Sequence, residues 1–310
     1  MEVGLVLVLA FVADVALGDP PDRLHPVAGM GRVIAFLEKG GMRGSPRWQF
    51  FYGAGIVLVT VALFAVPTFY LLAYLRGESM VIYVIVAAVL LKMSFAARGL
   101  WRAAERVRRL LLEERRAEVP GELRALVSRD TAALPDHLMV SAAVESVAEG
   151  LCDSIVAPLG YFLLGGVPAA IGYRAVNTMD AMIGYHGKYE YLGKAASRLD
   201  DVLNFIPARL AALLLVIAAF LAGADGKAAW RTAFREHSRT ESPNAGWPMA
   251  AMAGALGVQL EKAGHYRLGI PGKALEPATI TDAVRLMRVA ALLWGAGCLA
   301  IGGIYFAVTT

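Results

Sequence analysis

The stretch "FFYGAGIVLVTVALFAVPTFYLLAYL", Phe50–Leu75, contains no charged residue. About 20 consecutive apolar residues, wound as a helix, cross the roughly 30 Å hydrocarbon core of a bilayer. The run exceeds that length. Lipid offers no partner to backbone polar groups, so a helix, which satisfies them internally, is the structure that can cross there. The stretch therefore predicts a transmembrane helix.

Further apolar runs lie on both sides of this one, at Met1–Leu17, Met80–Ala97, Leu151–Tyr173, Phe205–Ala224 and Val289–Val308. The chain of 310 residues is 57% hydrophobic and 18% charged, against about 25% charged residues in soluble domains. We therefore expect an all-α, polytopic integral membrane protein with about four to six membrane segments. Amphipathic helices are expected on its cytoplasmic side, and residues 1–310 are expected to form a single domain.

Two of these runs have alternative interpretations. Met1–Leu17 has the length of a signal peptide, but it lacks a basic beginning, so a retained helix is expected. Leu151–Tyr173 is interrupted by prolines and glycines, and a run broken in this way spans, kinks or re-enters. The interrupting residues are Pro158, Gly160, Gly165, Gly166 and Pro168.

The charges between the runs predict orientation and limit the partners. The net charge is +4, with Lys and Arg in Gly18–Gln49 and Arg98–Gly150, and such residues accumulate on the cytoplasmic side. No basic stripe carries interleaved aromatic residues on a soluble module, so nucleic acid is not an expected partner. The two cysteines, Cys152 and Cys298, provide neither a zinc-ligand spacing nor a disulfide framework.

The connection "YRAVNTMDAMIGYHGKYEYLGKAASRLDD", Tyr173–Asp201, holds more acids, bases, amides and aromatics than solubility requires. This composition indicates a functional site. If Leu151–Tyr173 spans once, the connection lies opposite the basic segments. If that run re-enters, the connection stays on the cytoplasmic side, and both arrangements remain open.

A second set of acids precedes the fourth apolar run. Glu145, Glu149 and Asp153 are four residues apart, which places three carboxylates on one face of a predicted helix. Carboxylates that continue into an apolar segment are costly and often mark function. They either pair with the arginine-rich helix that begins at Arg98 and is expected to break at Pro120, or they bind magnesium or a cationic partner.

The stretch "SPNAGWP" near the C-terminal part predicts a turn, because two prolines and a glycine interrupt any helix or strand there. A helix rich in small residues, Met249–Leu260, is expected after it. Its "AMAGALG" allows another backbone or a ligand to approach closely.

Four motifs, in order and between apolar runs, resemble the CobD/CbiB family of cobalamin biosynthesis: "GDPPDRLHPVAGMGR", "YRAVNTMDAMIGY", "ASRLDDVLNFIPARL" and "SPNAGWPMAAMAGALGV". The resemblance runs from about Leu5 to Leu268. It implies a multi-pass cell-membrane enzyme, adenosylcobinamide-phosphate synthase. Such an enzyme joins the propionate carboxylate of adenosylcobyric acid to (R)-1-aminopropan-2-ol or its O-phosphate, using ATP as co-substrate and Mg²⁺. Membrane lipid and other membrane proteins of cobalamin assembly are further expected partners.

ATP use rests on this resemblance, because no Walker A or Rossmann glycine pattern is visible. The residue roles follow from chemistry: phosphoryl transfer needs cations and a carboxylate-held metal, and amide formation needs a base. We expect Asp180, Asp200 and Asp201 to be magnesium ligands or the base. Glu145 and Glu149 are further catalytic candidates. The expected phosphate or substrate contacts are His25, Arg174, Asn177, Lys188, Lys194, Arg198, Asn244 and Trp247.

Structural explanations remain open for several of these residues. Asp200 and Asp201 would be good N-caps for a helix that begins near Val202. Asn177 and Asn244 would be turn amides. His25 would be an interfacial histidine, and Trp247 an interfacial anchor.

Two other functions compete with the synthase. One is a non-enzymatic membrane scaffold, and the other is a transporter for a corrinoid or an amino alcohol. Transporters often contain paired repeats, and no repeat is evident in the sequence. For the synthase, we expect the four motif regions to meet at one cytoplasmic-side cavity.

Overall fold

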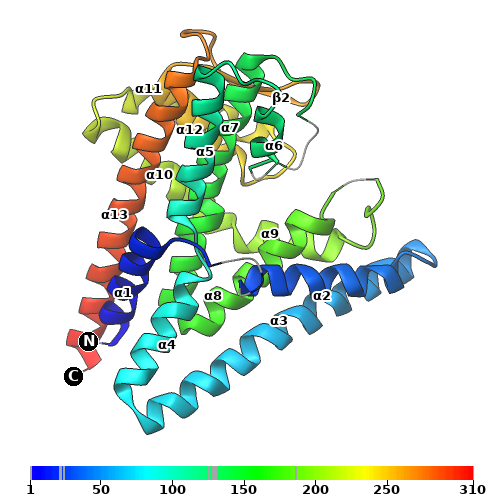
Figure 1. Ribbon diagram of the computed structural model, residues 1–310, viewed down its shortest axis with the longest axis vertical. Coiled ribbons are helices and arrows are strands. Elements are labelled where there is room, and N and C mark those ends of the chain that lie inside the picture. The colour runs from blue at the N-terminus through cyan, green and yellow to red at the C-terminus, as the bar shows by residue number, and fades with distance from the viewer. Residues whose placement is uncertain are drawn as a thin grey trace. The chain divides into compact units, whose positions relative to one another are not determined.

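The computed structural model describes residues 2–20, 23, 25–124, 126–127, 131–185 and 187–309. Helices make up most of this part of the chain (Figure 1), which confirms the all-α prediction apart from one small hairpin. In chain order the elements are α1 (Glu2–Leu17), α2 (Pro26–Gly41), α3 (Pro46–Glu78), α4 (Met80–Lys92), α5 (Ala97–Leu112), α6 (Val119–Leu123), α7 (Asp136–Leu151), η1 (Cys152–Val156), α8 (Ala157–Ile183), α9 (Lys194–Leu203), α10 (Phe205–Leu221), α11 (Gly226–Glu236), η2 (His237–Arg239), α12 (Gly246–Leu256), β1 (Gln259–Lys262), β2 (Tyr266–Gly269) and α13 (Pro277–Thr309).

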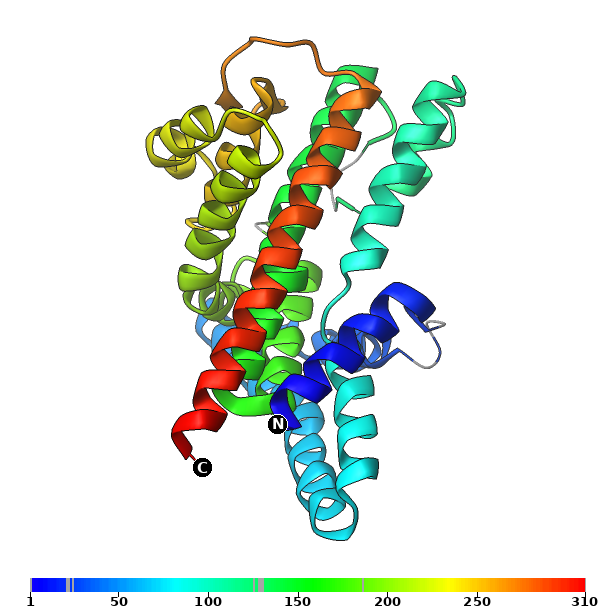
Figure 2. The ribbon, with the colours of Figure 1, turned by 90° about the vertical axis from the view of Figure 1, so that its left-hand side faces the viewer.

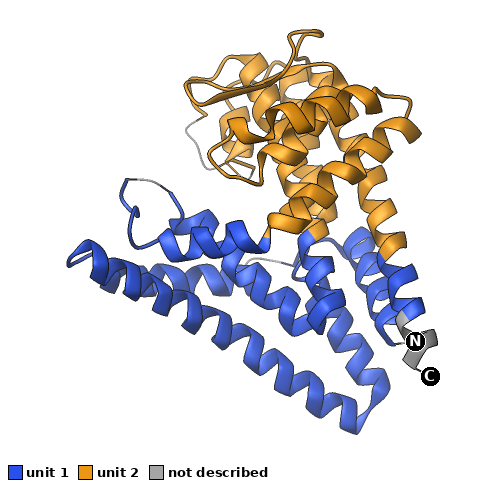
Figure 3. Cartoon of the chain, turned by 180° about the vertical axis from the view of Figure 1, so that it is seen from behind, with its two compact units in different colours: residues 1–96, 157–203, 298–310 blue, residues 97–156, 204–297 orange. Residues whose placement is uncertain are grey.

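The chain divides into two compact units, coloured separately in Figure 3. Unit 1 comprises residues 1–96, 157–203 and 298–310, and unit 2 comprises residues 97–156 and 204–297. The chain therefore passes between the units several times, and α13 contributes residues to both. The expectation of a single domain over residues 1–310 stays a prediction.

Within the described residues, four helical stretches are long and apolar enough to cross a membrane: Pro46–Glu78, Met80–Leu112, Asp136–Ile183 and Pro277–Ile304. A fifth is counted if α9 and α10 together form one span. This agrees with the predicted four to six segments. The first apolar run does form a helix, but α1 has 16 residues and is about 24 Å long, short of the hydrocarbon thickness.

In unit 1, α3 and α4 form a helical hairpin, which is clear at the bottom of Figure 2. Many of its large apolar side chains are exposed, among them Leu58 at 71%, Val81 at 69% and Phe69 at 56%. An apolar surface of this kind is unfavourable in water and favourable in lipid. The hairpin is therefore a membrane-embedded part of an integral membrane protein.

The fourth apolar run is interrupted where the sequence predicted an interruption. A π-helical turn, η1, precedes α8, and π turns add a residue to the helical ladder. Gly165 and Gly166 leave helical geometry, and Gly166 has a φ of +69°. Pro168 follows them, in the first turn after the break, where a missing N–H costs little.

In unit 2, α11 packs against α12, and β1 pairs with β2 in an antiparallel hairpin with Leu260 opposite Leu268. A Cβ on Gly254 would lie 2.5 Å from the Ala228 carbonyl oxygen of α11, so the small residues of α12 do allow the predicted close backbone approach. The predicted helix Met249–Leu260 is shifted. Its real end is at Leu256, because Gly257 adopts the left-handed conformation that terminates helices.

The predicted end of the arginine-rich helix is wrong. That helix, α5, ends at Leu112, well before Pro120. Pro120 lies instead in the first turn of α6, where proline is tolerated because the first-turn N–H groups have no intrahelical partner. One face of α5 is buried, through Ala104, Val107 and Leu111.

Candidate functional site

Unit 1 brings the second half of α8 against α9, and this contact gathers predicted site residues from two motifs. The amide Nδ2 of Asn177 donates to Oδ1 of Asp200 at 3.3 Å. One turn further along α8, Asp180 accepts a hydrogen bond from the hydroxyl of Ser197 on α9. We call Asn177, Asp180, Ser197, Asp200 and Asp201 the acidic cluster.

The glycine at the start of α9 explains how the two helices come so close. A Cβ on Gly193 would lie 1.7 Å from the carbonyl oxygen of Ile183, the last residue of α8. No other residue type fits there without moving the backbone. At the far end of α9, the Tyr161 hydroxyl on α8 donates to the Leu203 carbonyl at 2.9 Å. Both ends of α9 therefore lie against α8, and its C-terminal end is hydrogen-bonded to it.

The acidic residues of α9 do not cap a following helix, so that alternative is wrong. Asp200 and Asp201 lie inside α9, in its last turn. Carboxylates at a helix C-terminus face the negative end of the helix dipole, which is unfavourable. Asp200 is also 9% exposed, and a buried carboxylate needs compensation. Two acids in such a position fit a site better than they fit a stabilising role.

The predicted phosphate contacts lie at different distances from this cluster. An Arg174 guanidinium nitrogen donates to Asn177 Oδ1 at 3.4 Å. Arg198 is 74% exposed, and its guanidinium lies 4.0 Å from Asp201. Lys188 instead donates to the Tyr189 hydroxyl at 2.7 Å, and that hydroxyl contacts Glu38 of α2. Arg174 and Arg198 therefore lie beside the acidic cluster, whereas Lys188 has a local partner elsewhere.

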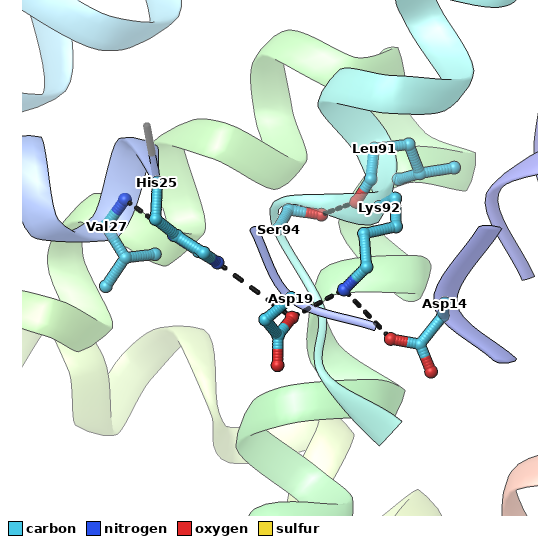
Figure 4. A network of polar contacts seen from close by, with 7 residues as sticks. All are labelled: Asp14, Asp19, His25, Val27, Leu91, Lys92 and Ser94. Atoms are coloured by element: carbon cyan, nitrogen blue, oxygen red, sulfur yellow. Dashed lines mark hydrogen bonds and ion pairs between the residues drawn. The ribbon is translucent and has the colours of Figure 1, made fainter. Parts of the chain in front are cut away.

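His25 occupies a different polar network in unit 1, drawn in Figure 4. It is the N-cap of α2, and its Nδ1 accepts from the Val27 backbone N–H at 3.2 Å. That bond places the ring proton of a neutral imidazole on Nε2. Nε2 lies 4.0 Å from Asp19, and Lys92 Nζ lies 2.5 Å from Asp19 and 2.9 Å from Asp14. We call Asp14, Asp19, His25 and Lys92 the lysine network.

Sequence reasoning singled out His25 but missed its partners. Lys92 lies inside an apolar run, as the last residue of α4, and is 5% exposed, and Asp14 is 1% exposed. A signal was present, because a buried lysine and a buried aspartate inside two apolar runs are costly unless they pair. The helix pair α1 and α4, which are in contact, brings them together.

In unit 2, Glu145 is buried, at 4% exposure. It accepts hydrogen bonds from the Ser141 hydroxyl at 2.6 Å and from the Tyr266 hydroxyl of β2 at 2.7 Å. Ser141 also accepts from the Glu261 backbone N–H at 2.7 Å. The hairpin β1–β2 is therefore attached to α7 through these polar groups. Ser141 and Tyr266 are site residues that the sequence analysis did not identify.

The other members of the predicted carboxylate stripe differ from Glu145. Glu149 is exposed. Asp153 lies in η1, where the helical spacing that would place it on the same face has changed. The stripe thus contains one buried carboxylate, at Glu145, rather than three equivalent ones.

Asn244 and Trp247 lie together at the start of α12. Asn244 is 4% exposed, and its Oδ1 accepts from Arg209 of α10 at 3.2 Å. The Arg209 guanidinium lies 5.1 Å from the centre of the Trp247 ring, and His237 stacks on that ring at 4.0 Å. Burial, and then the nearby Arg209 charge, lower the pKa of His237 below its usual 6.5. A neutral aromatic layer beside one cation is suited to a planar or anionic ligand.

The described residues contain no group of three or more His, Cys, Asp or Glu side chains arranged to hold a metal ion. This excludes, for that part of the chain, a metal cage made from such side chains alone. It does not conflict with magnesium, which is commonly held by one or two carboxylates together with phosphate oxygens and water.

Known proteins resemble this chain along nearly all of its length. It is 51% identical over 307 residues to "Cobalamin biosynthesis protein CobD" of Dehalococcoides mccartyi, covering 99% of both chains. It is 39% identical over 290 residues to "Probable cobalamin biosynthesis protein CobD" of Methanothermobacter thermautotrophicus, covering 93% of this chain and 94% of the relative. "Cobalamin biosynthesis protein CobD" of Klebsiella pneumoniae is 39% identical over 302 residues, covering 94% and 93%. No solved structure matches.

The family comparison agrees with these relatives. Residues 7–287 match the family described as "CobD/Cbib protein". That range includes all thirteen predicted site residues and both polar clusters of unit 1. The match and the relatives together show that the chain belongs to the CobD/CbiB family.

Proposed function

We propose that this chain acts in cobalamin biosynthesis, in the cell membrane, as an ATP-dependent amide-forming ligase. Its substrates would be adenosylcobyric acid and (R)-1-aminopropan-2-ol or its O-phosphate, and its product adenosylcobinamide or the corresponding phosphate. Family membership and the names of the relatives support the pathway. The chemistry of the acidic cluster supports the reaction.

The observation that carries the proposal is the joining of two motifs at the contact between α8 and α9. Asn177 and Asp180 come from one motif, and Ser197 and Asp200 from the other. They are linked by the hydrogen bonds from Asn177 to Asp200 and from Ser197 to Asp180. Such bonds fix carboxylate orientation, and oriented carboxylates are what a metal–phosphate site requires.

The cluster fits magnesium on chemical grounds. Asp201 lies close enough to Asp180 for repulsion between the two carboxylates, and Asp180 is largely desolvated. A divalent cation relieves such repulsion, and two carboxylates leave the remaining positions to phosphate oxygens and water. Asp180 and Asp201 would hold the ion, with Asp200 oriented by Asn177. Magnesium would neutralise charge on the ATP phosphates.

The proposed reaction has two steps. A carboxylate oxygen of the corrinoid propionate attacks the γ-phosphorus of ATP, the bond to ADP breaks, and an acyl phosphate forms. The amine nitrogen next attacks the acyl carbon, the carbon–nitrogen bond forms, and inorganic phosphate leaves. The nitrogen gives up one proton to a base. Arg174 and Arg198, beside the acidic cluster, would contact phosphate oxygens.

Purified protein in lipid nanodiscs provides the test. Incubation with adenosylcobyric acid, the amine, ATP and Mg²⁺ should form the amide, with one ADP and one phosphate released for each product molecule. Omission of the amine should abolish amide formation. Protein that binds the corrinoid but forms no amide with either amine would contradict the ligase and favour a scaffold. Corrinoid uptake into sealed vesicles without amide formation would favour a transporter.

A further inference from the structure

The turn between α2 and α3, together with the loop between α8 and α9, carries an exposed mixture of cations and aromatic rings. Figure 1 shows α2 and α3 side by side, and their turn lies at the same end of unit 1 as that loop. The exposed aromatic residues include Trp48, Phe51, Tyr185 and Tyr191. The exposed cations are Lys39, Arg43, Arg47, Lys188 and Lys194, which we call the basic belt.

Leu192 holds the loop against the junction of the two helices. A Cβ on Gly53 of α3 would lie 1.9 Å from the Leu192 carbonyl oxygen, and a Cβ on Gly41 of α2 would lie 2.5 Å from the Leu192 side chain. That side chain is fully buried. In the same loop, the Tyr189 hydroxyl donates to Glu38 of α2 at 3.2 Å. Loop and junction therefore form one surface, and they belong to the same side of the membrane.

The acids around the basic belt do not neutralise it. Residues 38–52 and 187–194 contain five cations and two carboxylates. One carboxylate, Glu38, accepts from Tyr189, and the other, Glu190, accepts from a backbone N–H of its own loop. Among the described residues, no hydrogen bond or ion pair involves the side chains of Lys39, Arg43, Arg47 and Lys194. Unpaired cations on one surface repel one another, and nearby anions remove that repulsion.

The position of these residues at the start of α3 points to the membrane interface. This helix begins at Pro46 and is one of the stretches long and apolar enough to cross a membrane. In its first two turns, Trp48 is 55% exposed and Phe51 is 70% exposed. Aromatic rings at the end of a spanning helix lie at the level of the lipid headgroups, and Lys and Arg gather beside them on the cytoplasmic side.

We propose that the basic belt and the neighbouring aromatic rings bind anionic phospholipid headgroups of the cytoplasmic leaflet. Basic residues next to a membrane surface attract anionic lipid, and the contributions of a cluster add up. The cations would contact phosphate oxygens, and the rings would lie against the acyl chains just below them. A soluble anion would satisfy the cations but would leave Trp48 and Phe51 exposed to water, whereas a phospholipid satisfies both.

This lipid contact also places the connection Tyr173–Asp201. Its residue types left two arrangements open, one on each side of the membrane. Since Leu192 fixes the connection to the α2–α3 junction, the basic belt puts it on the cytoplasmic side. That is the arrangement in which the fourth apolar run re-enters, and the break at Gly165 and Gly166 provides a bend for it. Lipid binding requires no turnover, so this inference is independent of the proposed function.

Titration calorimetry in neutral detergent micelles tests the lipid surface, with short-chain phosphatidylglycerol as the probe. Unaltered protein should bind this probe more tightly than phosphatidylcholine with the same acyl chains, and added salt should reduce the difference. Lys39→Gln/Arg43→Gln should weaken binding of phosphatidylglycerol by about tenfold or more, since each basic residue near an anionic surface contributes about fivefold. Binding of phosphatidylcholine should not change.

Two further variants provide the controls. Arg124→Gln/Lys227→Gln removes the same charge at exposed positions of unit 2 and should bind as unaltered protein does. Lys39→Arg/Arg43→Lys retains the charge and should retain the affinity, and a melting temperature verifies folding of each variant. Equal binding of the two lipids by unaltered protein would overturn the proposal, as would equal losses in the test and control variants. Competition by sn-glycerol 3-phosphate as strong as that by phosphatidylglycerol would overturn the lipid assignment in favour of a soluble phosphate.

Labelling from one side of the membrane tests the placement. Both native cysteines are buried, so Ser45→Cys at the junction and Tyr191→Cys in the loop each add one accessible thiol. A membrane-impermeant maleimide should react with both variants in inside-out vesicles and with neither in right-side-out vesicles. Reaction of the two variants from opposite sides would overturn the single surface, and reaction of both only in right-side-out vesicles would overturn its cytoplasmic placement. Protein that binds phosphatidylglycerol but forms no amide would contradict the proposed function and leave this inference intact.

Discussion

The acidic cluster of unit 1 and a groove of unit 2, lined by residues of α11, α12 and α13, differ in what holds their charges. In the cluster, carboxylates are buried or half-buried and are oriented by Asn177 and Ser197. In the groove, exposed cations such as Arg235 and Arg285 have no partner in the described residues. Fixed carboxylates suit chemistry in which orientation matters, whereas exposed cations suit neutralisation of a ligand. Substitutions in the cluster should therefore lower turnover.

The largest effect is expected at Asp180. Asp180→Asn keeps the shape and the bond to Ser197 but removes the charge, so amide formation should fall by about 10²- to 10⁴-fold, the range for a positioned acid–base group. Asp201→Ala should give a smaller loss with a raised Mg²⁺ requirement. Product formation measured against Mg²⁺ concentration separates the two effects.

An exposed carboxylate outside the cluster provides the control for Asp180. Glu78→Gln changes the net charge equally, at the end of α3, and should leave turnover and magnesium dependence unchanged. If Asp180→Asn and Asp201→Ala both match unaltered protein in turnover and in Mg²⁺ dependence, the metal assignment is wrong. A loss of melting temperature without loss of turnover would make these residues structural.

The second largest effect is a loss of folding stability when the lysine network is disrupted. Lys92→Met removes the cation between Asp14 and Asp19 and leaves Asp14 charged in an almost fully buried position. Removal of one partner from a buried ion pair costs about 3–5 kcal/mol. Unfolding in mixed micelles should show a loss of that size.

A second substitution separates charge from packing at this position. Lys92→Met/Asp14→Leu removes both charges and should recover most of the lost stability, since apolar replacements of a buried pair are often neutral. No recovery would mean that Lys92 contributes through packing. Lys92→Arg, which retains the charge, should be intermediate.

The fold was more predictable from the sequence than the site was. Apolar runs such as Phe50–Leu75 become helices because lipid allows few alternatives, and the break at Gly165–Gly166 follows from residue type. The contact of Asn177 with Asp200 was not predictable, because it depends on how residues far apart in the chain pack. The alternative of a helix that begins near Val202 was also wrong, since α9 continues to Leu203 and α10 begins at Phe205.

Ser141 and Tyr266 were missed for the same physical reason. Tyr266 and Ser141 are ordinary surface or helix residues by type, and they become site residues because they donate to Glu145. Lys92 carried a readable signal, as a charge in an apolar run, whereas Tyr266 carried none. Sequence patterns therefore identify residues that are costly in their context, and they miss residues whose role arises from a partner.

Smaller effects are expected on α7, where Glu145 and Glu149 provide a matched pair. Glu145→Gln alters a buried acceptor of two hydroxyl hydrogen bonds, and such changes cost about 1–3 kcal/mol. Glu149→Gln changes an exposed group and should stay within about 0.5 kcal/mol. Denaturation in micelles compares them, and equal effects would contradict the burial-based distinction. Tyr266→Phe should resemble Glu145→Gln more than Glu149→Gln.

The smallest effect is a pH dependence at His237. Burial and the Arg209 charge lower its pKa in the folded protein. Between the folded pKa and the ordinary value of about 6.5, the unfolded chain binds a proton that the folded protein does not. Stability should therefore fall as pH decreases below about 6.5, and the loss should level off once pH lies below the folded pKa. Above that window the residue contributes no pH dependence.

Melting temperatures between pH 5 and pH 8 measure this contribution, with His237→Gln as the test variant and His137→Gln as the control. His137 is exposed at the start of α7. His237→Gln should flatten the decline at acidic pH, because glutamine offers no proton site, while His137→Gln should keep the decline of unaltered protein. Arg209→Gln removes the second cause of the lowered pKa of His237. The loss of melting temperature at acidic pH should therefore become smaller but should not disappear, because burial is the larger cause. A steeper decline in His237→Gln would mean that protonated His237 stabilises the fold, and the sign assigned to this residue would then be wrong.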